Sequence, residues 1–381
     1  MKKILIIHNK YQHTGGEDIA VENEIKLLEK HFEVRVLFFD NNVGSYLTQF
    51  IFFLMNKNIQ STIVVKNNIK DFEPDIIYIH NTWFKASTSI FKVIKKSKIQ
   101  TIVKLHNFRF FCSKTFFSKK HLDGSDYCLA CGFKRDGKVL NRYFENNIIK
   151  SILLILYGRK YYKIIKNQEN LTLMVLTNFQ KSFLKSHGFS DNVVKYPNFI
   201  EMQEKYILNS KLNHIVYAGR ISPEKGVEDL IKTFNKSKLD NFILKIIGNG
   251  PQKEYLEKNY ASENVEFLGE ISNKETKIII SQSKAVATAT RLYEGQPTLL
   301  CEASLLKIPS IFPDTGGVKE FFPPGTQLIF NQFDYDDLEK KFNLLNDSKL
   351  ISDEGLRNYE FINNKLDEVN LIGMFKEIIS K

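Results

Sequence analysis

Short apolar runs rich in β-branched residues alternate with longer amphipathic segments along the chain. In the first half these runs cover residues 4–9, 34–39, 75–81, 101–107 and 171–178. Most of them are apolar throughout, which suits parallel strands that are covered by helices on both faces. Between the first two runs, Val21, Ile25 and Leu28 fall on one helical face and predict an amphipathic helix over 17–30. The alternation is typical of repeated βαβ units.

The same pattern starts again after residue 200. A polar stretch, 201–213, is followed by apolar runs at 214–220, 242–250, 265–270, 285–290 and 309–314. Between the first two of these, Val227, Leu230, Ile231 and Phe234 share a helical stripe. The chain is also longer than the roughly 250–300 residues at which a single core stops growing.

These patterns predict an α/β protein of two doubly wound, Rossmann-like domains. We place the domains at residues 1–200 and 201–354, with a last helix at about 355–381 that is expected to return to the first domain. Two such sheets facing each other form an interdomain cleft at the carboxyl ends of their strands, which is where doubly wound folds bind ligands.

Composition and charge narrow the class of protein. With 43% hydrophobic and 25% charged residues, the chain is typical of a packed globular protein. Residues 1–200 hold 31 Lys and Arg against 16 Asp and Glu, whereas residues 201–381 hold 23 against 27. The basic first half therefore favours an anionic partner, such as a membrane surface, a phosphate-bearing lipid or nucleic acid.

No targeting or membrane-spanning segment is predicted. The first apolar run is four residues long and ends at His8-Asn9, which is too short for a signal peptide. The longest apolar stretch, 148–157, is far shorter than the ~20 residues that a membrane span needs. We expect a protein of the cytoplasm, a reducing compartment in which its four cysteines need not form disulfides.

The segment 290–304 carries the most informative polar residues. Glu294 and Gly295 follow an apolar run, and Pro297 is expected at the first position of a helix because its fixed φ suits that position. The first amides of such a helix form a site for an anion such as a diphosphate. Glu294 and Glu302, eight positions apart, could each accept hydrogen bonds from sugar hydroxyls; a solvated helix face is the alternative.

A second segment, 217–230, also joins a predicted strand to a predicted helix. Arg220 lies at the carboxyl end of the strand, and Lys225 follows five residues later. Arginine offers a bidentate fork and lysine a point charge, a common combination for binding a diphosphate. Either cation alone would more simply be a solvated surface residue.

At these residues the chain resembles glycosyltransferase family 4, a family of retaining enzymes with the GT-B fold. The resemblance rests on the Glu294-x7-Glu302 element, on GR…KG at 219–226 and on DTGGVKE at 314–320. In the first domain, Gly15-Gly16 resembles the family's glycine-rich loop. His106 sits where the family carries a histidine at the end of a strand.

The resemblance implies a role for each matched position in the second domain. Arg220 and Lys225 would hold the donor diphosphate, Glu294 the donor sugar and Glu302 the ribose. The backbone at Gly295, Thr298 and Leu299 would meet phosphate or sugar, and Asn249 and Leu268 would flank the base.

In the first domain, His106 would approach the transferred sugar, and Gly15 and Gly16 would bring backbone close to phosphate. We expect His106, Arg220, Lys225 and Glu294 to be the catalytic residues, with no metal required for catalysis. Asp334 and Asp336, the acids nearest to a metal-binding DxD pattern, are expected to lie at an exposed helix start.

Three cysteines form a C-x15-C-x2-C pattern shortly after His106. Cys112, Cys128 and Cys131 could bind a structural zinc, with His121 as a fourth ligand, and related family 4 enzymes carry a similar insertion. Because a second CxxC pair is missing, thiols in a long loop are the alternative. The fourth cysteine, Cys301, is expected to be a buried apolar residue.

The segment 108–166 is basic and strongly aromatic. Phe108, Phe110, Phe111, Phe116, Phe117 and Phe133 occur among Lys and Arg residues. Exposed, these rings and cations would dock on an anionic membrane, whereas buried they would belong to the core.

Together these features predict a hexosyltransferase that moves a sugar from a UDP- or GDP-sugar to a saccharide or lipid-linked acceptor. Bacterial surface polysaccharide, such as capsule, O-antigen or lipooligosaccharide, is the expected product, made at the inner face of the cytoplasmic membrane. An epimerase, a phosphorylase or a nucleic-acid-binding protein is the alternative. An oxidoreductase is disfavoured because G-x-G-x-x-G follows none of the predicted strands.

Overall fold

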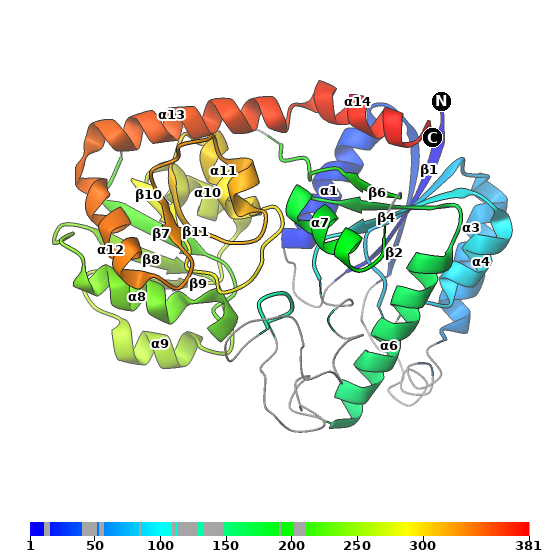
Figure 1. Ribbon diagram of the computed structural model, residues 1–381, viewed down its shortest axis with the longest axis horizontal. Coiled ribbons are helices and arrows are strands. Elements are labelled where there is room, and N and C mark those ends of the chain that lie inside the picture. Colours follow the sequence, from blue (N-terminus) through cyan, green and yellow to red (C-terminus); the bar gives the residue numbers. More distant parts are fainter. Residues whose placement is uncertain are drawn as a thin grey trace. The chain divides into compact units, whose positions relative to one another are not determined.

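In a computed structural model, the chain divides into two compact units. Unit 1 comprises Met1–Phe199 and Glu368–Lys381, and unit 2 comprises Ile200–Asp367. The structure describes residues 1–10, 16–39, 52, 57–83, 85–108, 112, 128–132, 148–189, 192–201 and 211–380. Its helices and strands are shown in Figure 1.

Unit 1 is built on a parallel sheet with the strand order β2-β1-β3-β4-β5-β6. Its strands are β1 (Lys3–Asn9), β2 (Glu33–Phe39), β3 (Ile76–Ile79), β4 (Gln100–Leu105), β5 (Leu171–Val175) and β6 (Val193–Lys195). The connecting helices are α1 (Gly16–Glu29), α3 (Ile59–Phe72), α4 (Ile90–Ser97), α6 (Ile148–Asn167) and α7 (Asn178–Ser186). Strands β1 and β3 are buried almost throughout, as their continuous apolar sequence predicts.

Unit 2 repeats this architecture with the strand order β12-β11-β10-β7-β8-β9. Its strands are β7 (His214–Ala218), β8 (Ile243–Ile247), β9 (Val265–Gly269), β10 (Ala285–Ala287), β11 (Ser310–Asp314) and β12 (Ile329–Asn331). The α-helices are α8 (Val227–Lys236), α9 (Lys253–Tyr260), α10 (Asn273–Ser281), α11 (Thr298–Leu305), α12 (Tyr335–Asn343) and α13 (Ser348–Lys365). Short 3₁₀ turns lie at η2 (Pro223–Lys225), η3 (Val318–Phe321) and η4 (Leu344–Asn346).

Each unit has its own hydrophobic core. In unit 1, Ile77, Val103 and Leu173 of the sheet pack with Ile90 and Ile94 of α4. In unit 2, the predicted stripe of Val227, Leu230, Ile231 and Phe234 is buried and packs on strand residues such as Ile215 and Leu244. The α/β fold with two doubly wound sheets is therefore confirmed.

The C-terminal end of the chain differs from the sequence prediction. The segment predicted as one helix at about 355–381 is two helices, α13 and α14 (Glu368–Ile378), which meet at Leu366-Asp367, and its last part returns to unit 1 as predicted. Helix α13 contacts α11 in unit 2, whereas α14, red in Figure 1, belongs to unit 1. There Phe375 is fully buried against the rings of Phe32, Tyr78 and Tyr196.

None of the described helices combines the length and the apolar character that are needed to cross a bilayer.

Candidate active site

Lys225 of unit 2 is positioned by the turn that joins β7 to α8. The 3₁₀ turn η2 ends at Gly226, whose φ of 65° lies in the left-handed region that favours glycine. A Cβ at Gly226 would lie 2.1 Å from the carbonyl oxygen of Ala289, so only glycine lets this turn approach the loop after β10. The sequence Lys-Gly at 225–226 therefore brings the Lys225 side chain to the loop that carries Glu294.

Glu294 accepts two hydrogen bonds at this point. Lys225 Nζ donates to Glu294 Oε1 over 2.6 Å, and the Thr290 hydroxyl donates to the same oxygen over 2.9 Å. Burial acts to raise the pKa of Glu294, but the Lys225 ammonium and the Thr290 hydroxyl outweigh it and hold that pKa below its usual range. Glu294 is thus a carboxylate at neutral pH, and about 27% of its side chain is still exposed to a ligand.

The segment 314–320 also contacts the loop that carries Glu294. Gly317 N donates to the carbonyl oxygen of Glu294, and the Thr315 hydroxyl donates to that of Leu292. Gly316 has a φ of 55°, and a Cβ there would lie 2.4 Å from the Glu294 carbonyl oxygen. Gly316 of DTGGVKE therefore acts by close packing against the Glu294 backbone, and Gly317 through its backbone N–H.

Sequence reasoning missed a second clamp on the same loop. Arg291 donates from Nε and from one terminal nitrogen to Asp229 Oδ2 of α8, at 3.1 and 2.6 Å. The Tyr335 hydroxyl of α12 donates to the same oxygen over 2.8 Å. Arg291 lies in the segment 290–304 and Asp229 lies in the first turn of α8, but nothing in their spacing indicates that they pair.

Arg220 and the start of α11 are the remaining candidates for binding phosphate. Arg220 follows β7, is exposed, and its guanidinium has no ion pair with any residue that the structure describes. Pro297 was predicted at the first helical position, which is wrong. It is the N-cap residue, with a ψ of 86°, and Thr298 begins the helix. Thr298 and Leu299 are partly exposed, and Gly295 is buried.

Glu302 has a different environment from Glu294. It lies in the second turn of α11 and forms an ion pair with Lys277 of α10, with 3.3 Å between Nζ and Oε1. Burial raises the pKa of Glu302, and the Lys277 ammonium offsets only part of that shift. Glu302 is therefore held by α10 and not by the η2 turn that holds Glu294, and a shared role for the two acids stays a prediction.

Three histidines lie at the carboxyl edge of the unit 1 sheet. His8 lies at the end of β1, His80 follows β3 and His106 follows β4, and these three strands are neighbours in the sheet. His80 Nδ1 and His106 Nε2 are 3.3 Å apart, which is one hydrogen bond between the rings. Burial lowers the pKa of both rings well below 6.5, so both are neutral at pH 7.

Only His106 of this group was predicted from the sequence, although a signal for the others exists. His8-Asn9 ends β1, and His80-Asn81 and His106-Asn107 directly follow β3 and β4, so that one dipeptide recurs at three neighbouring strand ends. His8 Nε2 is held by Asp18 Oδ1 of α1 at 2.8 Å. Among the described residues, the buried atoms His8 Nδ1 and His80 Nε2 have no hydrogen-bond partner.

A buried ion pair joins α1 to the same sheet. Lys104 of β4 donates to Glu24 Oε2 of α1 over 2.7 Å, and the Tyr78 hydroxyl donates to Glu24 Oε1 over 2.6 Å. Both charged side chains are fully buried. Separating the two side chains would leave a buried charge without its partner, which is strongly unfavourable. The pair therefore fixes the position of α1 on the sheet.

Several predicted residues have simpler outcomes. Gly16 is the first residue of α1 and is exposed, while Gly15 and His121 lie outside the described residues. Asp334 is the N-cap of α12, as predicted. Asn249 lies in the loop after β8, and Leu268 lies in β9, partly exposed.

The four cysteines lie in two parts of the structure. Cys301 is fully buried in α11, as expected. Cys112, Cys128 and Cys131 have their sulfur atoms within 4.8 Å of one another.

Phe108, from the basic and aromatic segment, is buried against the rings of Phe179 and Phe183. The other aromatic residues named above lie outside the described ranges: Phe110, Phe111, Phe116, Phe117 and Phe133.

Comparisons with known proteins show what this chain is similar to. Residues 198–360 match the family model of glycosyl transferases group 1. An uncharacterized 41.2 kDa protein in the cps region of Klebsiella pneumoniae is 22% identical over 341 residues, which are 86% of each chain. The amylovoran biosynthesis glycosyltransferase AmsD of Erwinia amylovora is 27% identical over 147 residues, 36% of this chain and 42% of that protein.

Solved structures share the fold of this chain. Sucrose-phosphate synthase from Thermosynechococcus elongatus superposes with a TM-score of 0.70 at 14% identity, covering all of both chains. Anabaena HepE, in a complex with UDP and glucose, superposes with a TM-score of 0.68 at 14% identity, also over all of both chains. The fold is therefore GT-B, and the group 1 match across unit 2, together with the glycosyltransferase relatives, supports the assignment of this chain as a GT-B glycosyltransferase.

Proposed function

We propose that this protein is a retaining, metal-independent glycosyltransferase of family 4. It takes a hexose from a UDP- or GDP-sugar and passes it to a saccharide acceptor carried on a lipid, in the assembly of a bacterial surface polysaccharide. The observation that carries this proposal is the Lys225–Glu294 pair, held beside the start of α11 by Thr290 and the two glycine-dependent loops.

The proposed donor site separates two tasks. Lys225, Arg220 and the first amides of α11 supply positive charge for the diphosphate, since a helix start and a cationic pair both favour an anion. Glu294, kept ionised by Lys225, accepts hydrogen bonds from hydroxyl groups of the donor sugar. Glu302 is proposed to bind the ribose, and Lys277 would then fix its orientation.

In the proposed reaction the bond between the anomeric carbon and the diphosphate oxygen breaks on one face of the sugar. The acceptor hydroxyl oxygen bonds to the same carbon on the same face, and its proton passes to the departing phosphate. Arg220 and Lys225 stabilise the charge that develops on that phosphate, and preorganised charge of this kind usually contributes most to such catalysis. This distribution of positive charge is the reason for proposing that no metal is needed.

His106 is proposed to approach the transferred sugar in its neutral form. Its ring already shares a hydrogen bond with His80, and burial disfavours a proton on either ring. The neutral pair can therefore donate or accept a hydrogen bond to a sugar hydroxyl without introducing a third cation. The buried nitrogens His8 Nδ1 and His80 Nε2 offer further places for hydroxyl groups or water, since a buried polar atom costs about 1–3 kcal/mol when it has no partner.

The product class is proposed from the relatives. One relative is encoded in a cps region and another is named for amylovoran biosynthesis. HepE was solved with UDP and glucose, which supports a uridine nucleotide as the first donor to test.

A donor panel tests this proposal. The purified protein is mixed with UDP-, GDP- and ADP-sugars, and its melting temperature is measured, because a ligand that binds only the folded state raises it. We expect a shift with one nucleotide and release of that nucleotide when an acceptor is added, with the α or β configuration of the donor preserved in the product. Strict dependence on Mg²⁺, or inversion at the anomeric carbon, would contradict the proposed chemistry.

Peripheral contact with an anionic membrane is part of the proposal. Helix α6 exposes Ile149 and Leu156, at 59% and 50% of their surface, and presents Arg159 and Lys163 to solvent. Apolar residues beside cations on one helix favour the interface of an anionic bilayer. A Leu156→Glu variant should sediment with phosphatidylglycerol vesicles less than the wild type does, with Leu212→Glu in unit 2 as the matched control. Equal sedimentation of the two variants would show that α6 does not contact the membrane.

A further inference from the structure

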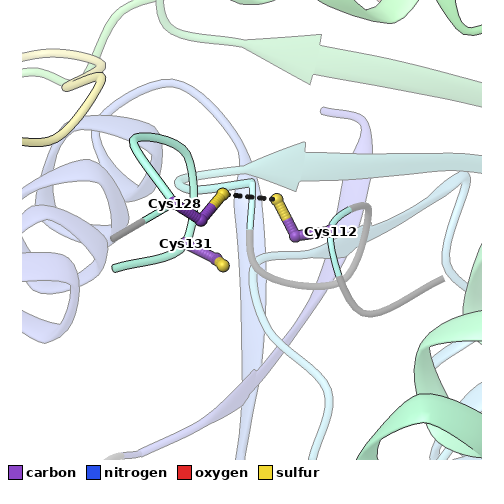
Figure 2. Close-up of side chains that lie close together, drawn as sticks. All are labelled: Cys112, Cys128 and Cys131. Atoms are coloured by element: carbon purple, nitrogen blue, oxygen red, sulfur yellow. Dashed lines mark hydrogen bonds between the residues drawn. The ribbon is translucent and has the colours of Figure 1, made fainter. Parts of the chain in front are cut away.

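Three cysteine sulfurs of unit 1 gather in one place. Cys112 comes from one segment, while Cys128 and Cys131 come from a turn sixteen and more residues later (Figure 2). Their Sγ atoms all lie within 4.8 Å of one another, and Cys112 Sγ lies 3.8 Å from Cys128 Sγ. Cys112 and Cys128 are fully buried and Cys131 is partly exposed.

The spacing of the sulfurs fits a metal ion better than a disulfide. A disulfide needs its sulfurs about 2.05 Å apart, well short of the 3.8 Å between Cys112 and Cys128. Tetrahedral zinc holds each thiolate at about 2.3 Å, which places any two of its sulfur ligands roughly 3.8 Å apart. Cys112 and Cys128 therefore have the spacing of two zinc ligands, and Cys131 Sγ lies within 4.8 Å of both.

The backbone around the cysteines is shaped to present the sulfurs. Residues 128–131 form a turn that Gly132 closes by donating its N–H to the Cys128 carbonyl oxygen over 2.9 Å. Gly132 has a φ of 74°, so glycine is favoured directly after the second cysteine of the CxxC pair. Cys112 N donates to the Phe108 carbonyl oxygen, which ties the first ligand to the end of the segment that follows His106.

We propose that Cys112, Cys128 and Cys131 bind one structural zinc ion as thiolates. Binding releases three protons, one from each thiol, and leaves the three thiolates and Zn²⁺ with a net charge of −1. The neighbouring sequence is basic, with Lys134 and Arg135 three and four residues after Cys131. The ion joins two segments that are far apart in the sequence and thereby fixes the chain that leaves β4 through His106. Zinc binding by the three thiolates does not require that unit 2 bind the proposed donor.

Zinc content and ligand type test the site directly. The full chain is purified under reducing conditions from zinc-supplemented cells, and its zinc is measured by inductively coupled plasma mass spectrometry before and after dialysis. We expect one zinc ion per chain, and X-ray absorption at the zinc edge should show three sulfur ligands at about 2.3 Å. Replacement by Co²⁺ should give an intense thiolate-to-metal charge-transfer band.

A matched pair of variants separates metal binding from folding. Cys131→Ala removes a ligand at the least cost in packing, because Cys131 is the partly exposed member of the cluster. Cys301→Ala changes a buried cysteine in α11 that lies outside the cluster. Cys131→Ala should lose its zinc on dialysis while circular dichroism still shows the folded protein, and Cys301→Ala should keep its zinc.

Three results would overturn the proposal. The first is wild-type protein without bound zinc, and the second is full zinc content in Cys131→Ala. The third is a Cys112–Cys128 disulfide, found by mass spectrometry of unreduced peptides from protein isolated without oxygen, which would make the cluster a redox pair instead.

Discussion

Lys225 keeps Glu294 ionised and holds it in position through their ion pair. In a Lys225→Met variant, Glu294 loses the ammonium group that lies 2.6 Å from its Oε1 atom. The diphosphate loses one of its two proposed contacts with a cationic side chain. We expect sugar transfer to fall about 100- to 1000-fold, the usual cost of removing one preorganised group that stabilises developing charge. Steady-state release of the nucleotide measures this. Lys236→Met, at the exposed end of the same helix α8, is the control and should keep wild-type turnover.

His80 should make the stability of unit 1 depend on pH. Burial lowers its pKa in the folded protein below the unfolded value of 6.5, so the unfolded chain takes up a proton first as the pH falls. The contribution of neutral His80 to the free energy of unfolding is therefore complete above about pH 6.5. At lower pH the free energy of unfolding decreases, by up to about 1.4 kcal/mol per pH unit.

Urea unfolding at pH 7.5 and pH 5.5 measures this effect. The wild type should lose up to about 1.4 kcal/mol more than a His80→Gln variant over that interval. His187→Gln, a change at a partly exposed ring on the C-cap of α7, should follow the wild type. If the wild type and His80→Gln lost the same stability, the assigned protonation state of His80 would be wrong.

At the scale of elements, the turns between strands and helices decide the geometry of the donor site. Gly226 combines a left-handed φ with close approach to Ala289. Gly269 has a similar φ of 69°, but a Cβ there would meet nothing within 4 Å. A substitution at Gly269 therefore tests the backbone strain alone, whereas one at Gly226 tests the strain together with the steric contact.

Gly269→Ala should lower the free energy of unfolding by about 1–2 kcal/mol, the cost of a left-handed conformation for alanine. Gly226→Ala should cost more than that, since the Ala289 backbone must also move, and should weaken nucleotide binding by displacing Lys225. Urea unfolding and the nucleotide-induced shift in melting temperature check the two parts. Equal stabilities for the two variants would show that the η2 turn can relax without strain.

For the molecule as a whole, α14 completes unit 1 with residues from the far end of the chain. Phe375 is fully buried among Phe32, Tyr78 and Tyr196, and Lys30 pairs with Glu368 at the start of the helix. Phe375→Ala should lower the stability of unit 1 by about 3–5 kcal/mol, the typical cost of removing a buried ring.

Val369→Ala on the same helix provides the comparison, because Val369 is 77% exposed. It should change stability by no more than about 0.5 kcal/mol. Hydrogen exchange of β1 and β3 would locate the loss in unit 1. If the two variants had the same stability, α14 would be an appendage and not part of the unit 1 core.

The sequence by itself determined the two series of βα units and most of their strands. Runs such as 75–81 and 101–107, which are mostly apolar before their final His-Asn, suit strands buried on both faces, so their pattern is local and strong. The short strands β6 (Val193–Lys195) and β12 (Ile329–Asn331) escaped prediction because three residues carry no measurable period. Lys225 and Glu294 were found because their motifs follow strand ends.

Only the tertiary structure decided which distant groups meet. The Lys225–Glu294 bond joins residues 69 positions apart, and Arg291 meets Asp229 across 62 positions. The repeated His-Asn dipeptide became meaningful only once β1, β3 and β4 proved to be neighbours, because strand order is set by the packing of the whole sheet. Local sequence fixes periodicity and turns, whereas long-range contacts depend on how every element buries its apolar face, and this is why the pairing within the site required the fold.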